Sequence, residues 1–456
     1  MLERDQDIII LGGGLVGSLL SIYLAKEGFQ VKVYEKRPDP RIADLDAGRS
    51  INLALSHRGI KALREVGLEE AVKPELIPMM GRIMHDTKGK TNYQPYGKKG
   101  QFINSVSRNR LNTVLVKEAI KEGVEFFFEH TCERVDTRIN QAFIKNLKKD
   151  ELLNLTASLI VGADGAFSSM RRSFQFVPGF NFSQDYLDHG YLELNIPPTD
   201  NGEFALEKNG LHIWPRGHFM FIALPNPDKS FTCTLFFPLK GDLSFESLDS
   251  QDKVKNFFET YFPDIIPIIP NIIEEFTKNP VSSLITIKSD PWAVNHCLLI
   301  GDASHAIVPF YGQGMNSGFE DCYELMRLAR TMDFDWDKVL PQYSEYRKKD
   351  ADAISNLALK NFIEMRDKVA DRSFLKRKKV EAAIHDLFPN LWVPQYAMVT
   401  FSDYSYSDAE YIGKLQDQVM RENRKIWEDR DPTPSDLALL AEKFNILMTT
   451  SLKAHL

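Results

Sequence analysis

The sequence predicts an α/β protein with a Rossmann-like dinucleotide-binding domain, an inserted antiparallel-sheet domain and a helical C-terminal region. Three observations carry this prediction. A strand, a glycine-rich turn, a helix and a second strand follow one another within residues 7–35. Between about residues 189 and 240 the pattern changes to strands joined by a short loop, which cannot belong to a parallel sheet. From about residue 342 the spacing of apolar residues is helical.

The N-terminal unit follows from its local sequence. Residues 8–11 form a continuous apolar run, which is typical of a strand buried in a parallel sheet. Residues 18–27 have a helical pattern, and Gly28 supplies a C-terminal stop. Gln30–Glu35 is the second strand, so the unit is βαβ with parallel, neighbouring strands. Residues 8–25 are uncharged and long enough to span a bilayer, but the glycine turn within them favours strand, turn and helix.

The later elements are predicted in the same way. Residues 218–224 and 230–236 flank a Pro-Asn-Pro-Asp-Lys loop, which predicts an antiparallel hairpin. Thr433-Pro434 is a typical helix start, and the residues that follow on one face are Leu437, Leu440, Phe444 and Leu447. Other expected elements are helices over 56–73 and 108–122, and strands over 152–161 and 298–300. We expect a discontinuous dinucleotide-binding domain (1–75, 100–180 and 285–340), a substrate domain (76–99 and 181–284) and a helical region (341–456).

Composition limits the classes of function. A net charge of −7 over 456 residues argues against nucleic-acid binding, which needs a concentrated basic surface. The four cysteines are far apart and form no C-x-x-C pair, which argues against zinc ribbons and disulfides and favours a reducing cytosol. No metal site is expected. We interpret the basic run at 376–379 as a solvated helix face rather than a lipid contact.

The glycine turn has the chemistry of a dinucleotide clamp. Gly12 permits the tight turn, Gly14 lets the backbone approach a pyrophosphate, and Gly17 lets helix and strand pack closely. The helix N-terminus offers free N–H groups to phosphates. Glu35 ends the second strand about 20 residues further on, where an acid accepts hydrogen bonds from a ribose diol. The clamp alone does not separate FAD from NAD.

Two further motifs favour FAD. Gly301-Asp302 follows the strand at 298–300, and an aspartate at a strand end suits a ribitol hydroxyl. The glycine-rich stretch at 312–316 opens a helix, and the N–H groups and dipole of that helix suit an anionic reduced flavin. Asp164-Gly165 follows another strand in the same manner.

These three motifs together resemble the fingerprints of the class A flavoprotein monooxygenases, the single-component aromatic hydroxylases, and lie in the expected order. The resemblance implies that Glu35 binds the adenosine ribose, Arg108 the flavin side chain and Asp302 the ribitol. Asp164 would support both FAD and a passing nicotinamide nucleotide. The expected cofactor-binding residues are Gly12, Gly14, Leu15, Val16, Gly17, Glu35, Lys36, Arg37, Ala54, Arg108, Asp164, Asp302, Gly314, Met315 and Asn316. The competing interpretations are a solvated helix charge for Arg108 and a helix N-cap for Asp302.

More particular segments resemble the kynurenine 3-monooxygenases, from about residue 8 to residue 405. They lie at 48–56, 81–85, 94–97, 211–215, 308–316, 360–365 and 396–402. L-Kynurenine is an amino acid with an aminophenyl ketone, and its carboxylate needs a bidentate cation, for which Arg82 is the candidate. Tyr311 departs from the family pattern, in which histidine or phenylalanine stands at this position, and it should face flavin and substrate.

The remaining substrate contacts are divided between polar and apolar residues. Tyr96 and Tyr396 would complete the carboxylate grip, and Asn361 suits the ammonium and carboxylate end. The residues expected to build the apolar slot for the ring are Ala54, Leu211, Met220, Leu224, Phe236, Pro309, Phe310 and Met365. Core packing is the competing interpretation for Met220 and Phe236, and a surface pair with His85 is the competing interpretation for Arg82.

The resemblance implies a reaction in which NADPH reduces tightly bound FAD and dioxygen forms a flavin C4a-hydroperoxide that hydroxylates L-kynurenine to 3-hydroxy-L-kynurenine. No catalytic side chain is expected, because the ring amine already activates its neighbouring carbon, and His305 is expected only to support the flavin loop. NADPH would dock transiently, since no second clamp exists in the sequence. The alternatives are a class A hydroxylase for another aromatic acid and a non-redox binding module on the same fold. Eukaryotic relatives have a C-terminal membrane anchor that this chain lacks, so a soluble, cytoplasmic, bacterial-type enzyme is expected, and a homodimer is left open.

Overall fold

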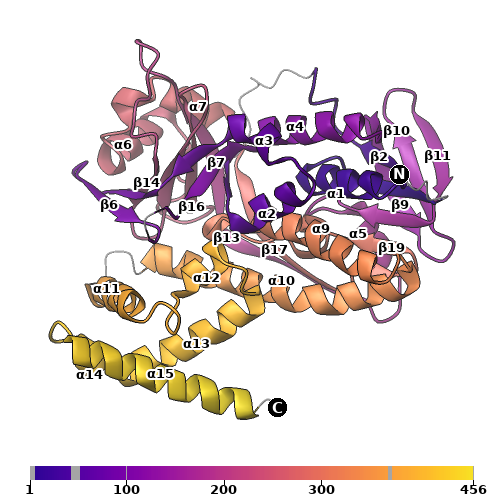
Figure 1. Cartoon of the computed structure of the whole chain (residues 1–456). Coiled ribbons are helices and arrows are strands. Elements are labelled where there is room, and N and C mark those ends of the chain that lie inside the picture. The colour runs from indigo at the N-terminus through magenta and orange to yellow at the C-terminus, as the bar shows by residue number, and fades with distance from the viewer. Residues whose placement is uncertain (1–5, 43–51, 99, 368–371, 455–456) are drawn as a thin grey trace.

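The computed structural model describes residues 6–42, 52–98, 100–367 and 372–454, except for the side chains of residues 365–367 and 452–454 (Figure 1). Its central parallel sheet has the order β18-β19-β12-β1-β2-β8. These strands are Ala293–Val294, Cys297–Leu299, Leu159–Gly162, Asp7–Leu11, Gln30–Glu35 and Glu125–Phe128. Only β18 runs antiparallel to its neighbour. The sheet is covered by α1 (Leu15–Lys26), α4 (Arg108–Lys121) and α9 (Gly314–Thr331), which bury one large apolar core with it.

The predicted βαβ unit is confirmed. Strands β1 and β2 pair in parallel, with Ile8 opposite Val31. The helix begins at Leu15 rather than at residue 18, because Gly14 at the end of the turn already serves as its N-cap. Gly28 follows the C-cap in a left-handed conformation that glycine adopts without strain. The turn is therefore shorter than predicted, and α1 starts directly after Gly14, with Gly17 in its first turn.

Two predicted elements are wrong in their extent. The helix expected over 56–73 is two helices, α2 (His57–Glu65) and α3 (Glu69–Val72), because Gly67 with φ +75° ends the first one. The strand expected over 152–161 is also two strands. β11 (Glu151–Thr156) pairs with β10 (Gln141–Asn146), which pairs with β9 (His130–Asp136), whereas β12 returns to the parallel sheet. Each half therefore serves a different sheet.

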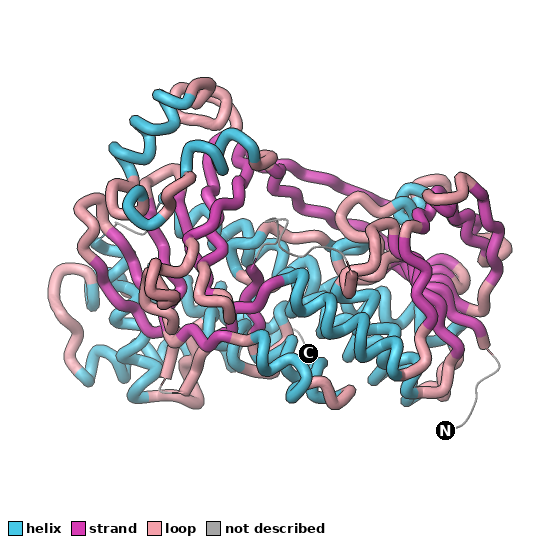
Figure 2. The backbone as a smooth tube through the Cα atoms, turned by 90° about the horizontal axis from the view of Figure 1, so that it is seen from above, coloured by secondary structure: helices cyan, strands magenta, loops and turns pink. Residues whose placement is uncertain are grey.

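A seven-stranded sheet forms the other end of the molecule, in the order β17-β13-β16-β15-β14-β5-β6. Its strands are Ser282–Asp290, Asn181–Ile196, Phe231–Pro238, Met220–Pro225, Gly210–Pro215, Gly81–His85 and Thr91–Pro95. The predicted hairpin is confirmed as β15 and β16, with Met220 opposite Phe236. Seen from above, strands gather at both ends of the molecule and long strands run between them (Figure 2). The proposed three-part domain division stays a prediction.

The two faces of this sheet have different partners. Phe221 and Ala223 point to α6 (Gln251–Tyr261) and α7 (Ile272–Lys278) and join an aromatic core there. Met220 and Leu224 alternate with them and point to the opposite face. A small sheet of β3 (Asn52–Leu55), β7 (Ile103–Ser107) and β4 (Ile77–Met79) lies beside it. Ala54 of β3 and Leu224 of β15 belong to one apolar cluster.

The helical end is confirmed and begins six residues earlier than predicted, at Trp336. Its helices are α10 (Trp336–Asp367), α11 (Arg372–Leu387), α12 (Gln395–Phe401), α13 (Tyr406–Glu422), α14 (Arg424–Trp427) and α15 (Pro434–Ala454). Thr433 and Asp436 exchange backbone-to-side-chain hydrogen bonds at the start of α15, as its sequence predicts. Over the described ranges, no helix is long and apolar enough to cross a bilayer.

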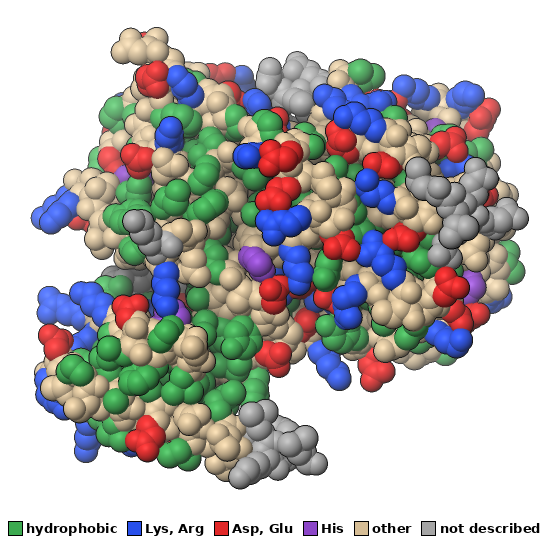
Figure 3. All heavy atoms as spheres, viewed as in Figure 1, with side chains coloured by type: hydrophobic (Ala, Val, Ile, Leu, Met, Phe, Trp, Pro, Cys, Tyr) green, Lys and Arg blue, Asp and Glu red, His purple; other side chains and the backbone are tan. Residues whose placement is uncertain are grey.

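The face shown in Figure 3 has charged side chains of both signs. Lysine and arginine side chains are interspersed with aspartate and glutamate over this face. Within the basic run at 376–379, Lys376 contacts Asp431, and Arg377 and Lys378 both pair with Glu381. The run is thus largely neutralised by its own neighbours, which favours the solvated helix face.

Candidate active site

The dinucleotide clamp is held together by Glu35. Glu35 as a residue is 5% exposed, and its carboxylate accepts hydrogen bonds from the Gly13 N–H at 2.7 Å and from the N–H and Nε of Arg37 at 2.9 and 2.8 Å. Burial alone would raise the pKa of Glu35, but the hydrogen bonds and charge of Arg37, with the Gly13 N–H, lower it below its ordinary value. Glu35 is therefore ionised. The Arg37 side chain is 47% exposed, so it can move aside when a diol takes its place.

The three glycines have different surroundings. A Cβ atom at Gly17 would lie 2.0 Å from the Gly12 carbonyl oxygen, and one at Gly12 would lie 2.4 Å from the Ala163 oxygen. Of the described residues, only Arg37 would lie within 4 Å of a Cβ at Gly14, through a guanidinium nitrogen at 3.7 Å. Gly12 and Gly17 are required by backbone packing, whereas Gly14 leaves space in front of the α1 N-terminus. That space fits a pyrophosphate.

Two aspartates lie at the carboxyl ends of neighbouring strands. Asp302 is the first residue of α8 (Asp302–His305), and its side chain is exposed. The N-cap of α8 is Gly301, so the interpretation of Asp302 as a helix N-cap is wrong. One oxygen of Asp164 accepts from the Ser169 and Met170 N–H groups, and its other oxygen is buried and has no hydrogen-bond partner in the described part of the chain. Burial raises the pKa of Asp164, as expected for a carboxylate short of donors.

The start of α9 faces the same region. The amide of Asn316 donates to the carbonyls of Ala54 and Gly312, at 2.7 and 2.9 Å, and accepts from the Ser56 N–H. This side chain therefore ties β3 to the helix and leaves only the backbone of Gly314–Asn316 for a ligand, because first-turn N–H groups have no partner within a helix. Arg108 is exposed at the start of α4, and its assignment stays a prediction, as do those of Leu15, Val16 and Lys36.

His305 is engaged away from this region. Its Nε2 lies 2.5 Å from the Asp321 carboxylate, which also accepts from Arg347 Nε at 2.9 Å and from the Gly301 N–H at 3.2 Å. Asp321 is completely buried. The arrangement supports the sequence-based expectation that His305 holds the loop after β19 rather than acting as a base.

Arg82 lies on β5, the strand next to the edge of the seven-stranded sheet, between aromatic side chains. Its guanidinium carbon is 5.2 Å from the ring centre of Tyr96 and 4.9 Å from that of Tyr396. Among the described residues no carboxylate pairs with it. His85 belongs to the other face of β5, where it contacts His212 at 2.9 Å and Asp264 at 3.2 Å. The interpretation of Arg82 and His85 as a surface pair is therefore wrong.

Three tyrosines are stacked around this cation. The ring centres of Tyr96 and Tyr396 are 5.8 Å apart, and those of Tyr396 and Tyr311 are 5.7 Å apart. Burial raises the pKa of all three phenols, so they stay protonated and can donate. The hydroxyl of Tyr96 is buried, and its proton has no acceptor among the described residues. An unpaired cation beside an unused donor is the arrangement that a carboxylate ligand would complete.

The apolar residues expected around the substrate are brought together in two adjoining clusters. Tyr96 packs with Leu224, Ala54 and Leu211, and Tyr311 packs with Met220, Phe236 and Phe310. Tyr396 and Ile222 contact both clusters. Pro309 opens the short η3 helix (Pro309–Tyr311), whose Phe310 carbonyl accepts from Asn361 at 2.6 Å. Residues 48–51 and the Met365 side chain lie outside the described part of the chain.

Some lining residues were missed. Met79, Ile103 and Ile222 pack in the same clusters. Met79 and Ile103 lie on short strands that no periodicity marks, and only the position of Ile222 between Met220 and Leu224, with period two, could have indicated it.

Comparison with known proteins agrees with this geometry. A family model described as an FAD binding domain matches residues 5–358. The kynurenine 3-monooxygenase of Flavobacterium johnsoniae is 47% identical over 426 residues, which are 93% of this chain and 95% of that protein. The enzyme of the same name from Christiangramia forsetii is 44% identical, over 96% of this chain and all of its own. The chain belongs to the kynurenine 3-monooxygenase family.

Members of this family are found well beyond bacteria, since the Sus scrofa kynurenine 3-monooxygenase is 44% identical over 91% of this chain and 88% of its own. Among solved structures, 2-methyl-3-hydroxypyridine-5-carboxylic acid oxygenase has a TM-score of 0.66 at 20% identity and covers 85% of this chain and 99% of its own. That likeness shows the fold, which is the predicted class: a parallel FAD-binding sheet, an antiparallel sheet and C-terminal helices.

The residues of the clamp fit FAD. The first N–H groups of α1, behind the space at Gly14, are donors, and the Asp164 oxygen that has no partner among the described residues is an acceptor. Both lie along the carboxyl edge of the parallel sheet, as an extended dinucleotide requires. Arg37 lies over the glycine turn and Asp302 is exposed at a neighbouring strand end. These residues would hold the cofactor, and we keep their individual contacts as proposals.

Replacement of Glu35 by alanine is expected to weaken FAD binding roughly 10-fold or more, because a charged hydrogen-bond acceptor contributes about 1.5–3 kcal/mol. Flavin absorbance per protein after dialysis measures this. Gln30→Ala, at the exposed start of the same strand, is the matched control and should retain its flavin. A Glu35→Ala protein that keeps a full complement of FAD would refute the assignment of Glu35 to the adenosine ribose.

Proposed function

We propose that this protein hydroxylates L-kynurenine at the ring carbon beside the amine and produces 3-hydroxy-L-kynurenine, using FAD, NADPH and dioxygen. One oxygen atom enters the C–H bond and the other leaves as water, with two electrons from NADPH. The observation that carries the proposal is Arg82, a guanidinium that faces Tyr96 and Tyr396 and pairs with no carboxylate among the described residues. Such a pocket suits an aromatic substrate that has a carboxylate.

The substrate would be held at both ends. Its carboxylate would meet the guanidinium fork of Arg82 and the hydroxyls of Tyr96 and Tyr396, while Asn361 would border its amino end. The aminophenyl ring would lie between Leu224 and the aromatic side chains of Phe236 and Phe310, whose ring centres are 4.9 Å apart. Binding from one charged end fixes which ring carbon reaches the reacting position.

The backbone at Gly314–Asn316 would contact the flavin ring where charge develops on reduction. When bound, FAD reduced by NADPH supplies the activated oxygen. The chain positions the ring and excludes water with Tyr311, Phe310 and Phe236, each less than a tenth exposed. The ring amine activates its neighbouring carbon, so no side chain needs to remove a proton.

NADPH consumption with and without L-kynurenine, with the product identified, tests the proposal. We expect L-kynurenine to accelerate consumption strongly and 3-hydroxykynurenine to accumulate. A panel of other aromatic acids distinguishes the alternative hydroxylase, since acceleration with hydroxylated product from one of them and not from kynurenine would replace the proposed substrate. A purified protein without yellow colour would contradict the flavin chemistry itself.

A further inference from the structure

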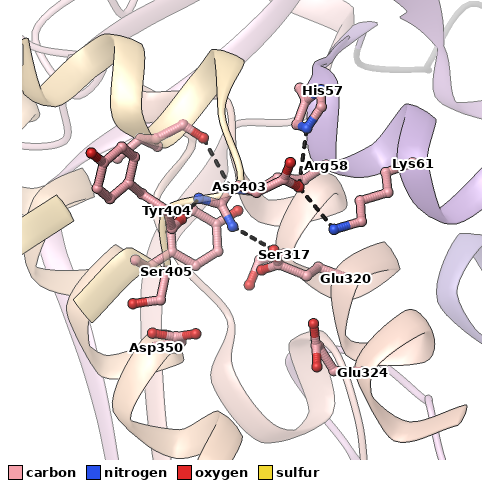
Figure 4. Close-up of polar contacts among 12 residues, drawn as sticks. His57, Arg58, Lys61, Ser317, Glu320, Glu324, Asp350, Asp403, Tyr404 and Ser405 are labelled. Atoms are coloured by element: carbon pink, nitrogen blue, oxygen red, sulfur yellow. Dashed lines mark hydrogen bonds and ion pairs between the residues drawn. The ribbon is translucent and has the colours of Figure 1, made fainter. Parts of the chain in front are cut away.

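Arg58 is a buried cation that the proposed chemistry does not use. It lies in the first turn of α2 and is only 4% exposed. Its Nη1 pairs with Glu320 of α9, its Nε donates to the Val399 carbonyl at 3.0 Å, and its Nη2 donates to the Tyr404 carbonyl. Figure 4 shows the guanidinium between α9 and the segment that follows α12. Every nitrogen of the side chain is therefore engaged with a different part of the chain.

The two carbonyls that Arg58 binds fix the end of α12. Val399 is among the last four residues of this helix, whose carbonyls have no partner within it, and Tyr404 follows in the loop to α13. The guanidinium carbon also lies 4.0 Å from the ring centre of Tyr406, whose hydroxyl donates to Gln313 at the start of α9. A cation at a helix C-terminus is favourable, and a fork of donors can hold both carbonyls at once.

This contact bears directly on the carboxylate pocket. The same short helix carries Tyr396, one turn before Val399, and Tyr396 contacts Arg82. Arg58 therefore lies between the helix of the proposed flavin contacts and the helix of a proposed substrate contact. A shift of the α12 end would move Tyr396 relative to Arg82, although Arg58 itself does not reach the pocket.

We propose that Arg58 is a positioning residue for kynurenine binding, which acts by fixing α12 so that Tyr396 lies against Arg82. The inference rests on the proposed function. It requires an arginine, because the ammonium of lysine cannot pair with Glu320 and hold two carbonyls in fixed directions. Glu320 keeps an ion pair with Arg347, at 3.0 Å, when Arg58 is removed, but Arg347 also pairs with Asp321 and Asp350, so Arg58→Met is expected to lower stability as well.

A double-mutant cycle separates positioning from general stability. The dissociation constant of L-kynurenine is measured by calorimetry on the FAD-loaded protein for wild type, Arg58→Met, Tyr396→Ala and the double variant. Arg58→Met should weaken binding roughly 10-fold in the wild-type background and less than about 3-fold beside Tyr396→Ala, because the residue it positions is then absent.

The matched control is Lys61→Met, one turn further along α2. Lys61 also contacts the loop after α12, through Asp403 at 2.8 Å, but this pair is exposed and should change affinity less than about 2-fold (Figure 4). If Arg58→Met binds no FAD or shows no cooperative thermal unfolding, Arg58→Lys takes its place in the cycle. This variant keeps the ion pair with Glu320 but cannot also hold the two carbonyls. Additive effects in the cycle, or an equal effect of Lys61→Met, would overturn the inference. A wild type that does not bind kynurenine would instead refute the proposed function.

Discussion

Replacement of Arg82 by methionine is expected to raise the dissociation constant for L-kynurenine roughly 30- to 1,000-fold and to leave the FAD content unchanged. Removing one partner of a buried, hydrogen-bonded charge pair costs about 2–4 kcal/mol, and each 1.4 kcal/mol is a factor of ten in affinity. Methionine preserves the length and much of the volume beside Tyr96 and Tyr396. The loss should therefore come from the missing charge rather than from collapse of the tyrosine stack.

Two comparisons make this expectation specific. Arg82→Lys keeps the charge but loses the two-pronged fork, so its affinity should fall between those of wild type and Arg82→Met. An analogue of kynurenine without the carboxylate should bind wild type and Arg82→Met about equally, because the group that Arg82 is proposed to bind is absent from it. Equal losses of affinity for kynurenine and for this analogue would show that Arg82 supports the pocket and does not bind the carboxylate.

The clamp was predictable because its determinants are local. Gly12, Gly17 and Glu35 lie within one βαβ unit, and the close approaches that demand glycine occur between neighbouring segments of that unit and the turn after β12. The β15–β16 hairpin was predictable for the same reason. A turn sequence between two apolar strands determines its pairing over a few residues, whatever the rest of the chain does.

Elements that depend on distant partners were not predicted correctly. Residues 152–161 are predicted as one strand, but β11 pairs with β10 and β12 pairs with β1, and only these pairings divide the segment into two strands. Buried ion pairs depend even more strongly on distant partners. Arg58 and Arg347 occur in polar helical segments that suggest solvated charges, yet both are buried because α9, α10 and α12 pack around them. Side-chain spacing in one helix contains no information about that packing.

The proposed substrate residues were predictable to an intermediate degree. Arg82, Tyr96 and Tyr396 were selected through a family resemblance, and the structure brings them together from β5, the residue after β6, and α12. No local pattern connects these positions, which are more than 300 residues apart at the extremes. Their proximity gives the resemblance a physical basis, whereas the binding role of each side chain awaits the affinity measurements.

Asp321→Asn is expected to cost about 3–5 kcal/mol of folding stability at neutral pH, because removing one partner of a buried ion pair leaves the others uncompensated. Asp321 is 0% exposed and lies at the centre of contacts to His305, Arg347 and the Gly301 N–H. An asparagine amide cannot accept from all three. Denaturant unfolding at pH 7 measures the loss, and Asp337→Asn is the matched control, since Asp337 is 85% exposed in its pair with His296 and should change stability by less than about 1 kcal/mol.

The pH dependence of this difference identifies its cause. Burial alone would raise the pKa of Asp321, but His305 and Arg347 outweigh it and hold the pKa below its ordinary value. A carboxyl group whose pKa is lowered on folding stabilises the protein above its unfolded pKa of about 3.9 and loses that contribution as pH falls through the lower, folded value. The stability gap between wild type and Asp321→Asn should therefore be constant above about pH 5 and shrink at lower pH. A gap that persists unchanged in acid would assign the loss to packing and not to charge.

Because Asp321 also accepts from Gly301, at the turn before Asp302, the variant should retain less FAD even where it is fully folded, which would connect this buried charge to the cofactor edge of the sheet.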